Sequence, residues 1–215
     1  MTESRVPVSA ADVYDDLGGA YEEAFGHQPS SAALDHLVEV LPPGSRVLDL
    51  GSGTGWPVAA TVAAAGHEVT GYDVSETMVR LARERVPAAR FERADMRSLA
   101  FTPGTWDAVL VFFSMLQLPR PEQDAMVTKV AGWLAPGGYC VLGTVPSDID
   151  GVTAEWMGHW IQVYSYSIPV LRQRLEAAGL EIVREDLVHF EPKTPDAAPE
   201  PQVYLTARKP VDVTP

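Results

Sequence analysis

Three glycines at alternate positions mark the part of the sequence that most directly suggests chemistry. Gly51, Gly53 and Gly55 follow a β-rich run in RVLDLGSGTGWPVAA, residues 46–60, and precede an Ala-rich helical pattern. Asp73 ends the next β-rich run, about 20 residues further on. A glycine turn alone says little, because glycines also form tight turns that bind nothing. Between a strand and a helix, with that distant carboxylate, the turn predicts a nucleoside-binding site.

The residues that flank the loop separate two kinds of nucleoside ligand. Dinucleotide sites use the spacing G-x-G-x-x-G, whose last glycine lets a helix N-terminus approach a pyrophosphate. Trp56 occupies that last position here, and Pro57 removes an amide that could bind a phosphate. Asp49 puts a carboxylate just before the loop, where it would repel a diphosphate and attract an ammonium and a sulfonium. The loop therefore favours a cationic nucleoside.

The elements that must position these residues alternate along the chain. Alternating strands and helices require crossover connections and therefore a parallel sheet, which binds ligands beyond the carboxyl ends of its strands. The last two β-rich runs, residues 180–190 and 201–210, have no helix between them. The predicted fold is therefore α/β: a doubly wound, mostly parallel seven-stranded sheet with an antiparallel C-terminal edge pair. The first five expected strands are residues 45–50, 67–73, 89–95, 106–113 and 138–144.

Capping and helix-breaking residues mark the ends of the expected helices. Ser75 is a predicted N-cap for a helix over residues 76–85, and Ser167 for one that ends at Gly179. Pro121 begins a helix that ends at the turn sequence APGG, residues 135–138. An earlier helix stops at Pro42 and shows the spacing of one buried face at Leu34, Leu37, Val38 and Leu41.

Composition and charge restrict the partners and the compartment. The 215 residues contain 16 Lys and Arg against 29 Asp and Glu, and the net charge of −13 should repel nucleic acid and anionic membranes. We therefore expect a small, neutral or cationic partner. The single cysteine, Cys140, allows no intrachain disulfide, and no secretory or membrane-spanning pattern is evident. These features indicate a cytoplasmic protein, either a monomer or a homodimer.

Five segments within residues 45–145 resemble the class I S-adenosylmethionine (SAM) dependent methyltransferases, in that superfamily's order. The later segments LEAAGLEIVRED and VYLTARKP are similar to the closing strands of its small bacterial members. The resemblance implies SAM as cofactor and S-adenosylhomocysteine as product. The five segments read VLDLGSGTG, VTGYDVSETMVRLAR, FERADMRSLAF, WDAVLVFFSMLQL and LAPGGYCVLGT.

The resemblance also implies roles for individual residues. Asp49 and the backbone from Gly51 to Gly55 would face the methionine moiety, and Asp73 would accept both ribose hydroxyls. Asp95 would accept from the adenine amino group. Asp73 could instead be a solvated strand end, and Asp95 a turn or cap. The other positions assigned to the cofactor are Ser52, Trp56, Val74, Met78, Met96 and Phe113, with Tyr14 and Tyr21 closing over it.

Methyl transfer from a sulfonium is an in-line displacement, so the protein must mainly align the reactants and exclude water. A base is needed only when the acceptor must lose a proton. His159 is the first candidate for this base, with a solvated or packed histidine as the alternative that such a residue more often represents. Gln117 could contact the substrate or cap a loop. The expected substrate-binding residues are Ser114, which follows the fourth strand, and Trp156, Trp160, Tyr164 and Tyr166. With Met157, the four aromatic residues would surround His159, or they could be ordinary core.

We predict no metal site. Asp148 and Asp150 are typical turn residues, and the sequence VFFSMLQLP after the fourth strand lacks an acidic residue. The expected organisation is a single domain over residues 1–215: an N-terminal helical cap (1–44), a cofactor-binding core (45–145), a substrate-cap insert (146–170) and closing elements (171–210).

The predicted function is methyl transfer from SAM to a small, partly hydrophobic acceptor, with oxygen preferred over nitrogen or carbon, in bacterial specialised metabolism. One alternative is a methyltransferase-like enzyme that binds SAM but catalyses another reaction, such as a cyclisation. A dinucleotide-dependent dehydrogenase is disfavoured by Trp56 and Pro57. A binding module without catalytic activity is a further alternative that the sequence leaves open.

Overall fold

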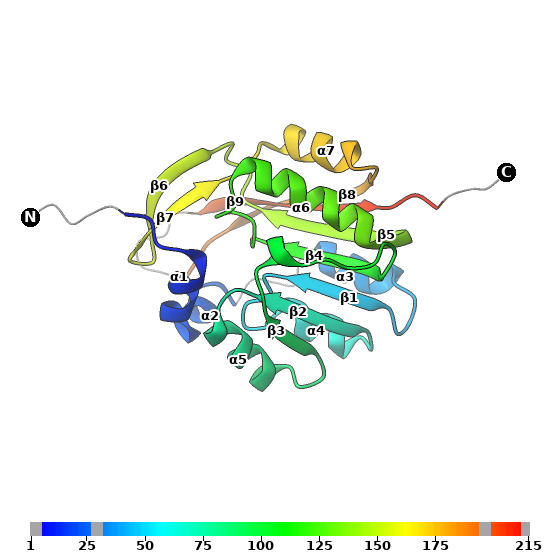
Figure 1. The fold of residues 1–215 in the computed structure, drawn as a ribbon, viewed down its shortest axis with the longest axis horizontal. Helices are drawn as coiled ribbons and strands as arrows, with labels where there is room; N and C mark the ends of the chain where they lie inside the picture. Colours follow the sequence, from blue (N-terminus) through cyan, green and yellow to red (C-terminus); the bar gives the residue numbers. More distant parts are fainter. Residues whose placement is uncertain (1–5, 27–31, 194–198, 212–215) are drawn as a thin grey trace, which may run out of the picture.

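The computed structural model describes residues 6–26, 32–193 and 199–211, and a seven-stranded sheet runs through its centre (Figure 1). The strand order is β3-β2-β1-β4-β5-β9-β8. The strands from β3 to β5 are parallel, whereas β9 runs antiparallel to both β5 and β8. This confirms the predicted fold class. The sheet strands are β1 (Arg46–Leu50), β2 (Glu68–Asp73), β3 (Arg90–Arg93), β4 (Trp106–Phe112), β5 (Leu134–Thr144), β8 (Glu181–Phe190) and β9 (Glu200–Arg208).

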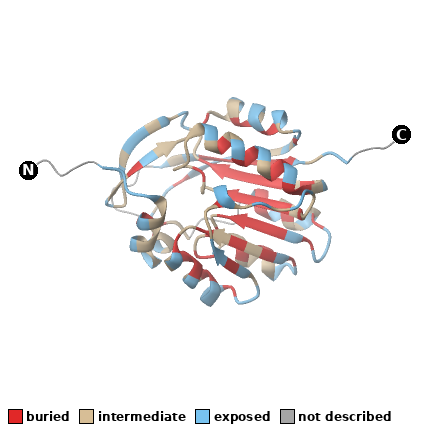
Figure 2. Cartoon of the chain, viewed as in Figure 1, coloured by how far each residue is buried: buried red, intermediate tan, exposed pale blue. Residues whose placement is uncertain are grey.

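Helices cover both faces of the sheet. One face packs against α6 and α7, and the opposite face against α3, α4 and α5. Because both faces are covered, the central strands are buried along most of their length, as Figure 2 shows, and most of their buried residues are apolar. The helices are α1 (Ala10–Leu17), α2 (Gly19–Phe25), α3 (Ala32–Val40), α4 (Val58–Ala64), α5 (Glu76–Arg85), α6 (Arg120–Trp133) and α7 (Ile168–Ala177), with a short 3-10 helix, η1 (Met96–Ser98).

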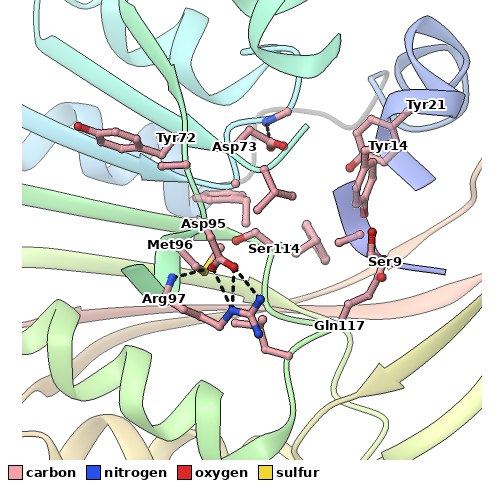
Figure 3. A pocket seen from close by; sticks show the side chains of 18 of the residues that line it. Ser9, Tyr14, Tyr21, Tyr72, Asp73, Asp95, Met96, Arg97, Ser114 and Gln117 are labelled. Carbon is pink, nitrogen blue, oxygen red and sulfur yellow. Dashed lines mark hydrogen bonds and ion pairs between the residues drawn. The ribbon is translucent and has the colours of Figure 1, made fainter. Parts of the chain in front are cut away.

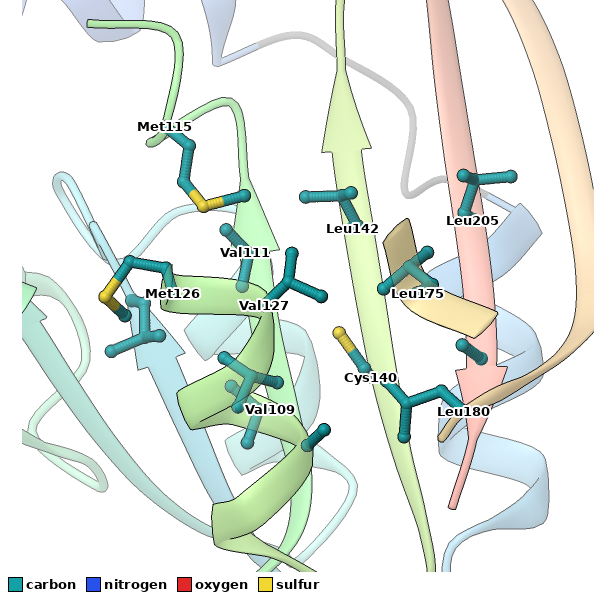
Figure 4. Packing of buried hydrophobic residues seen from close by; sticks show 14 of the residues in the cluster. Val109, Val111, Met115, Met126, Val127, Cys140, Leu142, Leu175, Leu180 and Leu205 are labelled. Carbon is teal, nitrogen blue, oxygen red and sulfur yellow. The ribbon is translucent and has the colours of Figure 1, made fainter. Parts of the chain in front are cut away.

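Successive residues of the central strands belong to different cores. On β4, Val109 and Val111 pack on the α6 and α7 side, whereas Ala108 and Leu110 pack on the other. This is the two-residue period of a strand with two buried faces. Figure 4 shows the first core, in which Cys140 of β5 packs as a small apolar side chain. Burial raises the pKa of the Cys140 thiol to about 12, so the thiol stays protonated.

The order of the strands reverses between β1 and β4, which makes this the position where a ligand site is expected. The helices α1 and α2 lie at the carboxyl ends of the parallel strands (Figure 1). A two-stranded hairpin, β6 (Asp150–Trp156) and β7 (His159–Tyr164), lies near the same edge. The amide of Val8 donates to the carbonyl of Trp160 at 2.8 Å and joins the N-terminal segment to this hairpin.

Two element boundaries differ from the sequence prediction. The residues of APGG do not form a free turn after α6, because β5 already begins at Leu134, which pairs with Trp106 before an irregularity in the register. The third strand ends at Arg93 instead of Asp95, because the Asp95 side chain accepts a hydrogen bond from the amide of Arg97 and caps η1. In addition, Ser167 precedes α7 without a side-chain capping bond.

Ser75 links the sheet edge to the N-terminal helices. Its hydroxyl oxygen accepts from the amide of Met78 at 3.0 Å and so caps α5, as predicted. The same hydroxyl donates to the carboxylate of Asp15 on α1, which also accepts from the amide of Thr77 at 3.0 Å. These hydrogen bonds lower the pKa of Asp15. One buried serine therefore serves both the start of α5 and the attachment of α1.

We expect Ser75→Ala to lower the free energy of unfolding by ~1–2 kcal/mol, because the helix cap and the bond to Asp15 are both lost. In a double-mutant cycle with Asp15→Ala, measured by urea denaturation, the two changes should be less than additive. Ser9→Ala provides the matched control, because it removes the cap of α1, a bond from the amide of Asp12 to the Ser9 hydroxyl that does not involve Asp15. Additive losses for Ser75 and Asp15 would show that the attachment contributes nothing.

Candidate functional site

A cavity of about 420 Å³ lies at the carboxyl ends of β1, β2 and β4 (Figure 3). It is lined by the loop after each of these strands, by the loop after β3 and by side chains from α1 and α2. It therefore occupies the point at which the strand order reverses. The residues predicted from sequence that line it are Tyr14, Tyr21, Gly51, Gly53, Asp73, Val74, Asp95, Met96, Phe113, Ser114 and Gln117.

Asp73 is held by the backbone at the end of β2. Its Oδ2 accepts from the amide of Gly53 and its Oδ1 from the amide of Ser75, both at 2.9 Å. Burial raises the pKa of Asp73, and the two amide donors partly oppose this effect. A carboxylate offers about four acceptor positions. The acceptor positions of Asp73 that Gly53 and Ser75 do not use could therefore bind two hydroxyls of a ribose.

The glycine loop passes close to the loop that follows β4. Gly51 has a φ of 73°, and a Cβ atom at this position would lie 2.1 Å from the Cβ of Ser114. Ser114 itself donates to the carbonyl of Leu50 at 2.6 Å. Only glycine permits both the left-handed backbone and this approach of two loops. The first glycine of the loop is thus required by the meeting of β1 and β4.

Asp49 is a buried carboxylate in which one oxygen, Oδ2, has no hydrogen-bond partner among the described residues. It lines a cavity of about 60 Å³ together with Ser52, whose buried hydroxyl also lacks a partner, and Trp56. Burial, with a further contribution from Asp73, raises the pKa of Asp49 to about 7. An unpaired buried charge is costly, and a bound cation offsets that cost. These residues fit an ammonium group.

Asp95 lines the larger cavity, but its carboxylate already has donors. Its oxygens accept from the backbone amide and from the guanidinium of Arg97, at 2.6 to 3.0 Å. These bonds lower the pKa of Asp95. The structure therefore shows the helix-capping role that the sequence left open, and an adenine amino group would have to share an oxygen with Arg97. The sequence reasoning did not single out Arg97.

Two residues assigned to the cofactor lie outside the lining of both cavities. Gly55 is buried against Val86 and Phe91, and Met78 is buried within α5. Trp56 lines the smaller cavity, although 54% of it is exposed, and its indole N–H donates to the carbonyl of Gly26 at 3.1 Å. Of these three residues, only Trp56 therefore lines a cavity.

A second cavity, of about 220 Å³, adjoins the first. Tyr14, Tyr21, Phe113 and Gln117 line both cavities and form the boundary between them. Most of the other lining residues are apolar and come from the loop after β5 and from the β6–β7 hairpin. The sequence reasoning missed the two polar residues that β9 contributes. The second cavity is also lined by Phe25, Leu116, Val145, Ser147, Ile149, Ala154, Glu155, Trp156, Ile161, Val163, Ser165, Glu200 and Gln202.

The expected cluster of aromatic residues around His159 is not formed. Only Trp156 of the expected aromatic residues lines the second cavity. Trp160 and Tyr164 alternate along β7 with the lining residues, because neighbouring residues of a strand point to opposite faces. Tyr166 lies beyond the hairpin in the core, where its hydroxyl donates to Asp124 at 3.1 Å.

His159 itself lies outside the lining of both cavities. Its Nε2 is 3.2 Å from Oδ2 of Asp16, so it joins the hairpin to α1. The structure therefore does not bring the predicted base to the predicted acceptor pocket.

The tyrosines at the boundary between the two cavities stay protonated. Their ring centroids lie 5.4 Å apart in an edge-to-face arrangement. Burial raises the pKa of Tyr14 well above its usual value and that of Tyr21 to about 12. Neutral hydroxyls and aromatic rings thus separate the cavities, without a cation that would repel a positively charged ligand.

Neither a metal cluster nor a membrane span is found in the described part of the chain. Within residues 6–26, 32–193 and 199–211, no three His, Cys, Asp or Glu side chains converge on one point that could hold a metal ion. Asp148 pairs with Arg120 instead. No helix in the same ranges has the length and the apolar character needed to cross a bilayer.

The fold and the site are those of a doubly wound α/β protein with a nucleoside-binding cavity at the point where the strand order reverses. Comparisons with known proteins identify proteins that are similar to it. Residues 47–138 match the family of the methyltransferase domain. The 27-O-demethylrifamycin SV methyltransferase of Amycolatopsis mediterranei is 30% identical over 183 residues, which cover 78% of this chain and 64% of that protein. The trans-aconitate 2-methyltransferase of Paracidovorax citrulli is 37% identical over 129 residues, 59% of this chain and 49% of that protein.

Solved structures share the fold. The 1,6-didemethyltoxoflavin-N1-methyltransferase of Burkholderia thailandensis, solved with 1,6-didemethyltoxoflavin and S-adenosylhomocysteine, superposes with a TM-score of 0.68 at 21% identity, covering 95% of this chain and 92% of that one. The [4+2]-cyclase SpnF superposes with a TM-score of 0.73 at 22% identity, covering 96% and 97%.

Residues 47–138 thus match a methyltransferase-domain family, and the chain is similar in sequence to curated methyltransferases and in fold to solved SAM-dependent methyltransferases. The aligned regions span about half to two thirds of the length of the curated relatives: 48%, 50% and 64% for three of them.

The raised pKa of Asp49 predicts that SAM binds more weakly in acid. A cation is attracted to the ionised carboxylate. Asp49 takes up a proton as the pH falls through about 7, and its negative charge is then lost. Between about pH 7 and pH 5.5, where an α-ammonium stays charged, we expect the Kd for SAM to rise roughly tenfold. Isothermal titration calorimetry measures this change.

Asp49→Asn should flatten this pH dependence and leave only the contribution of Asp73. Asp95→Asn is the matched control, because the lowered pKa of Asp95 keeps this residue ionised throughout the range. An Asp49→Asn variant with the full pH dependence of the wild type would contradict the role of Asp49.

Proposed function

We propose that this protein transfers a methyl group from SAM to a small, partly apolar acceptor. The observation that carries the proposal is the pair of adjoining cavities. The cavity of about 420 Å³ is lined by the buried carboxylate of Asp73 and by the glycine loop. The second cavity, of about 220 Å³, is mainly apolar, and we call it the acceptor cavity. The two share Tyr14, Tyr21, Phe113 and Gln117. A donor and an acceptor bound in them would meet at this boundary, as a displacement reaction requires.

The residues of the chain would bind and shield the reactants. Asp73 would hold the ribose, and Asp49 would hold the ammonium group of the methionine moiety. SAM, when bound, supplies a methyl group on a positive sulfur that needs no further activation of the leaving group. The rings of Tyr14 and Tyr21 would exclude water from the boundary. The reaction would thus depend mainly on alignment.

The nature of the acceptor follows from the size and the charge of the site. The acceptor cavity, at about 220 Å³, lies below the usual range for small-molecule sites of ~300–1,000 Å³, which favours a compact acceptor. The net charge of −13 opposes nucleic acid as a substrate. Oxygen is the proposed acceptor atom, in a cytoplasmic reaction of bacterial specialised metabolism. The relative named for 27-O-demethylrifamycin SV supports this choice.

A second candidate is a reaction of another kind, such as a cyclisation in a shaped pocket. The TM-score of 0.73 over 96% of the chain with a protein named as a [4+2]-cyclase favours it. The acceptor cavity also has no histidine, lysine or cysteine among its described lining residues that could act as a base. The same absence is compatible with a methyl transfer that needs only alignment.

We expect Asp73→Asn to weaken SAM binding by about two orders of magnitude, because two hydrogen bonds from ribose hydroxyls to a charged acceptor are lost or weakened. Isothermal titration calorimetry measures the change. Asp107→Asn is the matched control: Asp107 also accepts from a backbone amide, that of Arg46 at 2.7 Å, but lies outside the cavities. Equal affinities for the two variants would remove Asp73 from the cofactor site.

Incubation of the protein with methyl-labelled SAM and a bacterial extract distinguishes the two candidate functions. Methyl transfer predicts a labelled small molecule and one S-adenosylhomocysteine for each labelled product, both lost with Asp73→Asn. SAM that stays bound and is never consumed, while the extract yields an unlabelled new product, would favour the second candidate. Mass spectrometry of both pools provides the readout.

A further inference from the structure

The wall of the acceptor cavity contains a set of aromatic rings already in contact with one another. The ring of Trp156 lies 5.9 Å from that of Tyr14 and 5.7 Å from that of Phe25, and Phe25 stacks on Tyr21 at 5.3 Å. These residues come from α1, α2 and the β6–β7 hairpin, so the wall exists only where all three elements meet. Aromatic surfaces of this kind favour flat ring systems, which stack or pack edge to face.

The charged groups of this cavity are all acidic. Glu155 and Glu200 line it, whereas no lysine, arginine or histidine occurs among its described lining residues. Glu155 is exposed on the hairpin, whereas Glu200 at the start of β9 is half-buried. An anionic acceptor would meet only like charge here, and a neutral or cationic one would not.

Glu200 is held by a chain of hydrogen bonds that begins in the sheet. The hydroxyl of Tyr204 donates to Oε1 of Gln202 at 3.1 Å, and Nε2 of Gln202 donates to Oε1 of Glu200 at 2.9 Å. The ring of Tyr204 packs against that of Phe113 at 5.7 Å. One carboxylate oxygen of Glu200 is therefore engaged by Gln202. The hydrogen bonds of the described residues provide no donor for the other, Oε2.

Glu200 also lies within electrostatic range of the boundary between the two cavities. The pKa of Tyr21 is raised by burial first, then by the charge of Asp73 and the charge of Glu200. Tyr21 therefore feels both the carboxylate of the cofactor cavity and that of the acceptor cavity. An acceptor bound to Glu200 would lie beside this boundary.

We propose that Glu200 selects the acceptor: the cavity takes a flat, apolar ring compound that donates an N–H or O–H hydrogen bond to Oε2 of Glu200, and it excludes carboxylates and phosphates. This inference rests on the proposed function. Glu200 is a specificity-determining residue in this account. The aromatic wall accepts the ring, and Glu200 requires the donor, because a ligand that displaces water from the half-buried Oε2 without donating a hydrogen bond leaves this oxygen unpaired.

Three matched probes test the selection: 2-naphthol carries the donor, 2-methoxynaphthalene has nearly the same shape without it, and 2-naphthoate is an anion. Each is titrated into protein saturated with S-adenosylhomocysteine, and binding is followed by fluorescence. The wild type should bind 2-naphthol about tenfold more tightly than 2-methoxynaphthalene, and 2-naphthoate least tightly. Glu200→Gln should reduce the preference for 2-naphthol to roughly twofold and strengthen the binding of 2-naphthoate.

Glu155→Gln is the matched control, because it removes a carboxylate from the same cavity at an exposed position. This variant should keep the preference of the wild type for 2-naphthol. Equal binding of the three probes to the wild type, an unchanged preference in Glu200→Gln, or no binding of any probe would overturn the selection by Glu200. Titration of S-adenosylhomocysteine alone comes first, because its failure to bind would refute the proposed function, whereas its binding without probe discrimination would refute only this inference.

Discussion

Two buried carboxylates, at the carboxyl ends of parallel strands, are the constraint on which the rest of this site depends, because each must be compensated by a hydrogen-bond donor or a positive charge. Asp49 and Asp73 end neighbouring strands, and the charge of Asp73 adds to the burial that raises the pKa of Asp49. Backbone amides from Gly53 and Ser75 compensate Asp73, but Oδ2 of Asp49 has no partner. A positively charged group bound here would offset the burial of Asp49, whereas a pyrophosphate would meet like charge.

The N-terminal helices close the site through contacts of unequal strength. The pair between His159 and Asp16 involves an aspartate with 75% of its side chain exposed, and exposed ion pairs contribute ~0–1 kcal/mol. Each aromatic contact of Tyr14 and Tyr21 with Trp156 contributes ~0.5–1.5 kcal/mol beyond its buried area. The aromatic rings therefore hold α1, α2 and the hairpin together more strongly than the ion pair does. The rings of Tyr14 and Tyr21 also lie at the boundary between the two cavities.

The sequence predicted the fold and the cofactor edge because both depend on local patterns. Alternation of β-rich and helical runs determines a doubly wound sheet, and Asp73 follows β2 at the distance expected from the glycine loop. Gly51 illustrates the limit of this reasoning. The sequence identified Gly51 as part of a ligand-binding loop. The reason why this position must be glycine is the approach of Ser114 from the loop after β4, which depends on the three-dimensional arrangement.

The acceptor side was predicted less well because it depends on contacts between distant segments. The aromatic residues of the insert were expected to surround His159, but successive residues of the hairpin point to opposite faces and Tyr166 enters the core. Glu200 and Gln202 reach the cavity from β9. The antiparallel pairing of the last two strands was predicted, but no local pattern indicates that β9 lies between β5 and β8. Asp95 was predicted to contact the cofactor, but the hydrogen bonds from Arg97 to both of its oxygens are evident only in the structure.

The most direct test of the central claim, that this edge binds a cationic nucleoside, is a calorimetric comparison of SAM with NAD on the wild-type protein at neutral pH. The account predicts that SAM binds measurably and that NAD, whose pyrophosphate would face Asp49 and lack the amide removed at Pro57, binds at least about a hundredfold more weakly. Binding of NAD as tight as that of SAM would contradict it.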